Sequence, residues 1–152
     1  MAHKQRSKQG NLSDWMMPYH AALHALDGLE TVVDWSQMEG LCAGIYASKT
    51  GRPSTPIAIL LRALLLGTWY GLSDVKLEAA LVRDLLFRKF CGLAMNDTAP
   101  DHSTLSRFRS QLVEKALWER IFDEVNQQLM AQHIIITQGA VSIIDATVVE
   151  AH

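Results

Sequence analysis

PIAILLRALLLGTWYGL, residues 56–72, is the stretch that decides the fold. Apolar residues lie on nearly every side of a helix drawn through it, which is typical of a helix at the centre of a bundle. Thr55 and Pro56 predict the start of this helix, as N-cap and first-turn proline, and Gly71 predicts its end. The run is too short to span a bilayer and contains Arg62, so it predicts a buried helix and no membrane partner.

Further helices are predicted on both sides of this central one. Cap residues and apolar periodicity place them at residues 34–47, 73–82, 84–91, 102–112 and 114–131. Asp34 and Gln37 have the spacing of a capping box, and Ser73 and Asp101 are suited to N-cap positions. A shorter helix is predicted within residues 15–29. The chain is therefore expected to be mainly α-helical.

The period of the apolar residues changes after Gln132. Ile134–Ile136 and Val141–Ile144, separated around Gln138 and Gly139, predict two strands joined by a short turn. We therefore expect three regions: a basic flexible tail at residues 1–13, a helical domain at 14–132, and the beginning of a second, sheet-containing domain at 133–152.

Composition narrows the class of protein without naming it. The chain has 152 residues, is 49% hydrophobic and 20% charged, and carries a net charge of −2, as expected of a globular protein. Its two cysteines, Cys42 and Cys91, are predicted to be reduced core residues. The N-terminus has no apolar core of a signal peptide, so a cytoplasmic location is expected.

Charge is distributed in blocks along the chain. Residues 10–47 contain five acids and no base, whereas residues 48–109 contain nine bases and five acids. The overall balance argues against uniform affinity for nucleic acid, but the central block is compatible with a DNA-facing segment and equally with domains that dock on each other.

The predicted helix at 102–112 is the strongest candidate for a DNA contact. At 100° per residue, Leu105, Phe108 and Leu112 share one face. The opposite face has small hydroxyls and longer polar groups: Ser103, Ser106, Arg107, Ser110 and Gln111, with Arg109 at the edge of the apolar stripe and Thr104 in the first turn. Small side chains would let the helix approach a duplex, where Arg107 and Gln111 could reach bases or phosphates.

A plain solvated face of a bundle helix explains the same pattern. The connection at 92–100 is also longer than the turn of a usual helix-turn-helix, so the match to that motif is loose. Arg52, in the loop at 49–53, is a candidate phosphate contact. The alternative is that this loop is simply exposed to solvent. Arg88 and Lys89 adjoin two phenylalanines that should be buried, and are therefore expected to point outward.

Asp145 ends the apolar, strand-like run that starts at Val141. A carboxylate there is costly to bury unless a metal ion or a hydrogen-bond network uses it. The alternative is a strand-end aspartate satisfied by Ala146 and Thr147 of the following turn. The residues alone leave both interpretations open.

Several of these pieces, taken in order, resemble the transposases of bacterial insertion sequences. The matching strings are Gly51-Arg52-Pro53, Leu60 to Leu66, Tyr70-Gly71-Leu72-Ser73-Asp74, Pro100 to Arg109 and Ile144-Asp145-Ala146-Thr147. The particular likeness is to the group with an InsH-type N-terminal domain and a catalytic triad of two aspartates and a glutamate, called DDE. The resemblance extends from about residue 15 to 150.

The resemblance implies different functions for the helical part and for the part that follows it. The helical part would bind double-stranded DNA at the terminal inverted repeats and support assembly of two subunits. The catalytic part would be an RNase H-like fold whose first strand carries Asp145 as the first acid of the triad and a metal ligand. In such enzymes two divalent ions, usually Mg²⁺, promote in-line phosphodiester attack.

The chain supplies no second aspartate or glutamate of that triad after Asp145. The resemblance is therefore to the N-terminal part of a transposase, with a truncated RNase H-like domain, and we expect it neither to cut DNA nor to bind Mg²⁺ by itself. Self-association or association with an intact transposase is expected. The alternatives are a free-standing helical DNA-binding regulator, an inhibitor of transposition, or a protein-interaction bundle. Residues 133–152 are expected to be poorly ordered or held only by packing on the helices.

Overall fold

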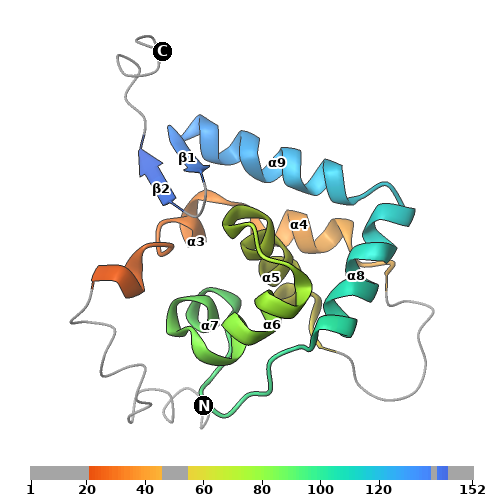
Figure 1. Cartoon of the computed structure of the whole chain (residues 1–152). Helices are drawn as coiled ribbons and strands as arrows, with labels where there is room; N and C mark the ends of the chain where they lie inside the picture. Colours follow the sequence, from red (N-terminus) through yellow and green to blue (C-terminus); the bar gives the residue numbers. More distant parts are fainter. Residues whose placement is uncertain (1–20, 46–54, 138–139, 144–152) are drawn as a thin grey trace, which may run out of the picture.

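Helices make up most of the molecule (Figure 1), as the sequence predicts. The computed structural model describes residues 21–45, 55–137 and 140–143. In chain order the elements are η2 (Ala21–His24), α3 (Leu29–Val32), α4 (Trp35–Leu41), α5 (Ile57–Tyr70), α6 (Asp74–Arg83), α7 (Leu85–Cys91), α8 (His102–Glu114), α9 (Trp118–Ala131), β1 (Ile134–Thr137) and β2 (Ala140–Ile143).

Helix α5 lies at the centre of the bundle, where α4, α6, α7, α8 and β1 contact it (Figure 1). Its leucines at 60, 61, 64, 65 and 66 are fully buried, which confirms the prediction of a helix that is apolar all round. Gly67 lets α6 approach, because a Cβ there would lie 3.0 Å from the Leu77 side chain. Gly71 ends the helix in the left-handed region, with φ of 66°.

Within the part of the chain that the structure describes, no single helix is long and apolar enough to cross a membrane. Helices α5 and α6 pass such a test only when taken together, with a bend of 111° between them.

Three N-caps lie where their residue types predict them. Ser73 accepts a hydrogen bond from the Lys76 N–H at the start of α6, and Asp101 accepts one from Thr104 at the start of α8. Asp84, the single residue between α6 and α7, accepts from two N–H groups of the next turn. At α5 the prediction was off by one residue, since Pro56 occupies the N-cap position and offers no side-chain acceptor.

Helix α4 is shorter than predicted and is capped by a distant residue. It ends at Leu41 instead of residue 47, and turns follow to Ile45. Asp34 accepts from the Gln37 N–H as expected. The Asp34 N–H, however, donates to Gln128 Oε1 on α9 at 2.6 Å, and Gln128 Nε2 donates in turn to Gln37 Oε1. The return half of the capping box is thus supplied through α9.

The boundary between α8 and α9 was predicted too early. Helix α8 continues to Glu114, and α9 begins at Trp118 instead of residue 114. Between them Ala116 has φ of 57°, and the Leu117 N–H donates to the Leu112 carbonyl at 2.7 Å. This is the hydrogen bonding of a Schellman motif with alanine at the position that usually holds glycine.

Strands β1 and β2 form an antiparallel hairpin in which Ile134 pairs with Ile143 and Thr137 with Ala140. Strand β1 packs against α9 and α5, and Ile134 is part of the core. The described part of the hairpin therefore agrees with the expectation of packing on the helices. Residues 144–152 lie outside the described residues, so the assignment to an RNase H-like domain stays a prediction.

Candidate nucleic-acid interface

Helix α8 has the two faces that its periodicity predicts. Leu105, Phe108 and Leu112 are buried in the core. The opposite side exposes Ser103, Ser106, Arg107 and Ser110, with Thr104 and Gln111 half-buried beside them. The Arg107 guanidinium lies 3.5 Å from the Thr104 hydroxyl oxygen, at the limit of a hydrogen bond. No acidic residue occurs from His102 to Val113, so this face is positive.

Arg109 is held by α6 instead of pointing away from the bundle. Its guanidinium donates to both carboxylate oxygens of Asp74, at 2.7 and 2.6 Å, in a two-pronged ion pair. The hydrogen bond from Arg109 holds the pKa of Asp74 below its usual value, against the opposing effect of partial burial. This pairing disfavours Arg109 as a DNA contact and gives it a role in fastening α8 to α6.

The N-terminus of α8 already has its acceptors. Glu78 of α6 accepts from the His102 backbone N–H at 2.8 Å, and its carboxylate also lies 2.8 Å from His102 Nδ1. Asp101 accepts from the Thr104 N–H and from the Ser103 hydroxyl, and hydrogen bonds to these two residues, the Thr104 N–H foremost, lower the pKa of Asp101 to about 2. A phosphate at this helix end would face two carboxylates. DNA contact is therefore better assigned to the side of α8 than to its first turn.

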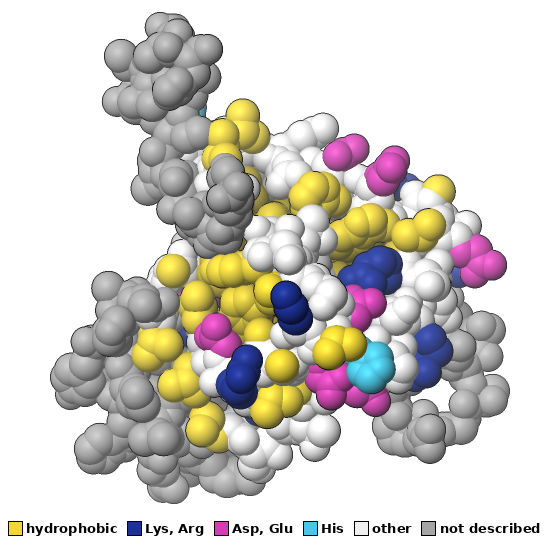
Figure 2. Space-filling model, in the orientation of Figure 1, with side chains coloured by type: hydrophobic (Ala, Val, Ile, Leu, Met, Phe, Trp, Pro, Cys, Tyr) yellow, Lys and Arg dark blue, Asp and Glu magenta, His cyan; other side chains and the backbone are white. Residues whose placement is uncertain are grey.

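Helix α6 adds charged and apolar side chains that the sequence reasoning did not single out. Lys76 and Arg83 are exposed and lie seven residues apart, and Val75 and Val82, each directly before one of them, are 62% and 59% exposed. On the face shown in Figure 2, basic side chains are spread over the part formed by α6 and α8 with acidic ones among them, and further acidic side chains stand along α9. The seven-residue spacing was visible in the sequence.

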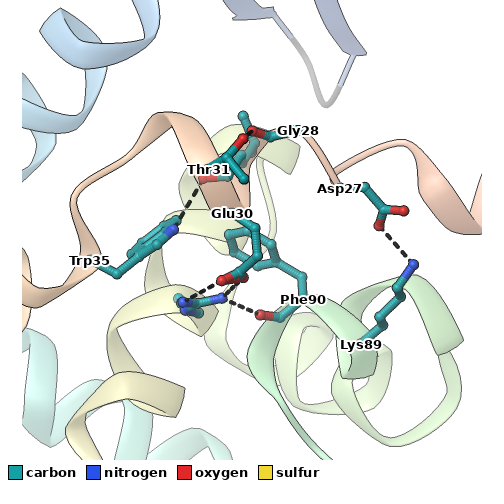
Figure 3. Close-up of polar contacts among 9 residues, drawn as sticks. Asp27, Gly28, Glu30, Thr31, Trp35, Lys89 and Phe90 are labelled. Atoms are coloured by element: carbon teal, nitrogen blue, oxygen red, sulfur yellow. Dashed lines mark hydrogen bonds and ion pairs between the residues drawn. The ribbon is translucent and has the colours of Figure 1, made fainter.

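Of the two bases predicted to point outward, Arg88 points inward, whereas the Lys89 side chain stays 31% exposed. Arg88 is only 6% exposed and donates to backbone carbonyls, so the expectation that it lies at the surface is wrong. Lys89 donates to the Asp27 carboxylate at 2.7 Å (Figure 3). Burial raises the pKa of Asp27, but hydrogen bonds from Lys89 and His24 outweigh it, and the net shift is downward. These bases serve the bundle itself.

A second arginine, Arg62 of α5, fastens the N-terminal segment of residues 21–45. Its guanidinium donates to Glu30 of α3 and to the Phe90 carbonyl, the latter at 3.0 Å (Figure 3). It also lies over the Trp35 ring, 4.3 Å from the centroid, and 5.4 Å from that of Phe90. Arg62 is thus committed to holding α3 and α4 against α5 and α7.

Two predicted site residues, Arg52 and Asp145, lie outside the described residues. His20 also lies outside them. His20 and His24 have the i, i+4 spacing of a metal-binding pair, but this spacing is more often that of an ordinary helix face. Over residues 21–45, 55–137 and 140–143, no group of three or more histidine, cysteine, aspartate or glutamate side chains could hold a metal ion.

Comparison with known proteins identifies the scaffold. The family model described as Transposase domain (DUF772) matches residues 18–111, more than half of the chain, so the chain belongs to this family. The match runs from just before η2 to Gln111 in α8. It includes the ion pairs between α6 and α8 and most of the positive face of α8. No solved structure matches the chain.

Proposed function

We propose that this chain is the DNA-binding part of a bacterial insertion-sequence transposase, and that the exposed face of α8 contacts the duplex at the ends of the element. We call this surface the α8 face: Ser106, Arg107, Ser110 and Gln111. The observation that carries the proposal is an acid-free, exposed helix face on a scaffold of the transposase-domain family.

The chemistry of the α8 face suits a duplex. Hydroxyl side chains are short enough to let a helix backbone approach the groove and can donate to phosphate oxygens. Arg107 and Gln111 are one helical turn apart, so both could reach into a groove together, where arginine pairs with guanine and glutamine with adenine. Lys76 and Arg83 of α6 would add phosphate contacts beside them.

For the catalytic step we propose Asp145 as one carboxylate of the two-aspartate, one-glutamate set. Mg²⁺ prefers hard oxygen ligands and usually takes one or two carboxylates from the protein. When bound, such ions activate the attacking oxygen and stabilise the leaving oxygen. Asp145 follows β2 closely in sequence, so β1 and its packing on α9 would help to hold it in place. We also propose that two copies assemble on paired DNA ends.

The test is fluorescence anisotropy with short labelled duplexes taken from the DNA on either side of the reading frame, against a shuffled duplex, over a salt series. We expect preferential binding to a flanking duplex and a linear fall of log K with log salt. Arg107→Ala should reduce that slope by about 0.9, the contribution of one phosphate contact, or relax sequence preference if Arg107 reads a base.

The matched control is Arg120→Ala, which removes an exposed arginine from the acidic side of α9. It should leave affinity and slope unchanged. Equal losses in the two variants would mean that only net charge matters. No binding of the wild-type chain to any flanking duplex would refute the proposed function.

A further inference from the structure

Arg88 is a buried cation whose guanidinium is surrounded by backbone carbonyls. It donates to the Leu81 carbonyl at 2.8 Å, to the Asp97 carbonyl at 2.8 Å, and to the Ala94 carbonyl. It makes no ion pair with a carboxylate in the part of the chain that the structure describes. Such a group is expensive to bury unless its N–H donors are satisfied, so the three carbonyls must be kept in place around it.

These carbonyls belong to two different parts of the chain. Leu81 lies in the last turn of α6, where unpaired carbonyls and the helix dipole favour a cation. Ala94 and Asp97 lie in the connection of residues 92–101 between α7 and α8. The Arg88 backbone adds to the attachment, because its carbonyl accepts from the Leu93 N–H at 2.8 Å. Arg88 therefore binds the end of α6 and the connecting loop at once.

The connecting loop leads directly into the α8 face. Its Asp97 carboxylate accepts from the Ala94 N–H at 2.8 Å, which closes the loop around the guanidinium. Leu93 and Pro100 are buried, and Asp101 follows as the N-cap of α8. The position of the loop therefore fixes the point in space at which α8 begins.

We propose that Arg88 is a positioning residue for DNA recognition: by holding residues 92–101 against the end of α6, it sets the position of the first turns of α8, and hence of the α8 face, relative to Lys76 and Arg83. The inference rests on the proposed function. Arg88 does not touch DNA, because its side chain is buried. The pairs Arg109–Asp74 and His102–Glu78 keep α8 on α6 without it, so its loss should shift the start of α8 instead of unfolding the domain.

Arg88→Lys is the first variant to make. It keeps the charge but has one nitrogen in place of the two guanidinium nitrogens that bond the Leu81, Ala94 and Asp97 carbonyls. Hydrogen–deuterium exchange should become faster in residues 92–104 and stay unchanged in α5 and α9. Affinity for the flanking duplex should fall about tenfold, the scale of one poorly placed base contact, while the salt slope stays that of the wild type. Arg120→Lys, an exposed substitution on α9, is the control and should change neither exchange nor salt slope.

Asp97→Ala is the second variant, in case Arg88→Lys fails to fold. It removes an exposed carboxylate from the loop. Exchange in residues 92–104 should become faster and DNA affinity should fall, both by less than in Arg88→Lys. A folded Arg88→Lys variant with wild-type exchange and affinity would overturn the inference. A reduced salt slope in that variant would also overturn it, because it would indicate that Arg88 contacts DNA directly. If the wild type binds no duplex, the proposed function fails; faster exchange confined to 92–104 would then show that Arg88 organises the loop without a role in DNA recognition.

Discussion

The N-terminal segment of residues 21–45 and helix α8 are both fastened to the bundle by an arginine and a carboxylate, but in different surroundings. Arg62 holds the segment with a side chain only 14% exposed, between aromatic rings and a backbone carbonyl. Arg109 holds α8 through Asp74, with side chains 33% and 22% exposed and beside the solvent. Removing the Arg62 side chain leaves the Phe90 carbonyl without its donor, whereas the pair of Arg109 with Asp74 mainly fixes an orientation.

The largest effect is expected for Arg62→Ala. It removes the contacts with Trp35 and Phe90 and leaves the Phe90 carbonyl without its donor, so the free energy of unfolding should fall by about 3 kcal/mol. Urea unfolding followed by tryptophan fluorescence measures it. Lys89→Ala, which breaks the more exposed pair with Asp27, is the control and should cost less than about 1 kcal/mol. Similar losses in both would remove the distinction between buried and surface attachment.

A double-mutant cycle on Asp74 and Arg109 should give a coupling energy of about 0.5–1 kcal/mol, as for a well-formed pair near the surface. The single variants should weaken DNA binding more than their stability loss explains, because α8 is less firmly oriented. The measurement combines urea unfolding with anisotropy on the flanking duplex. A coupling energy near 3 kcal/mol would place Arg109 in the same class as Arg62.

Stability should depend on the Asp101 cap in a defined pH range. Because its pKa is lowered to about 2 in the folded chain, from an ordinary value of 3.8, the ionised cap stabilises the fold above about pH 4. That contribution is lost as the pH falls toward 2. The Tm difference between wild type and Asp101→Asn, which keeps a neutral cap, should shrink over this range. A difference independent of pH would show that charge at the cap has no role.

The smallest effect on stability is expected for Arg107→Ala, within about 0.5 kcal/mol of the wild type, since the side chain is exposed and only loosely bonded. A Tm measurement checks it alongside the DNA titration. A large loss of stability would mean that the α8 face is part of the bundle's support and not a surface kept for a partner.

The sequence best predicts those structural features that depend on residues within one or two helical turns of each other. The caps Ser73 and Asp101 could be predicted because an N-cap depends on a side chain and N–H groups two or three residues away. The buried and exposed faces of α8 followed from periodicity. The end of α8 was missed because nothing about alanine indicates the positive φ that Ala116 adopts.

Tertiary partners could not be read in the same way. Arg109 was assigned to DNA because its partner Asp74 is 35 residues away in the sequence. Arg88 was assigned to the surface because its acceptors are backbone carbonyls, which every residue has and no sequence pattern marks. In both cases the fold decided what the side chain binds.

The hydrogen bond from the Asp34 N–H to Gln128, 94 residues apart, has a consequence for synthesis on the ribosome. While the chain is still emerging, α4 lacks one of its two end contacts, and only the late arrival of α9 supplies it. The start of α4 is therefore expected to be completed only when α9 arrives, although Arg62 can attach the segment to α5 and α7 earlier. Nascent chains stopped before residue 128 should expose residues 34–41 to protease, whereas those released after α9 should protect them.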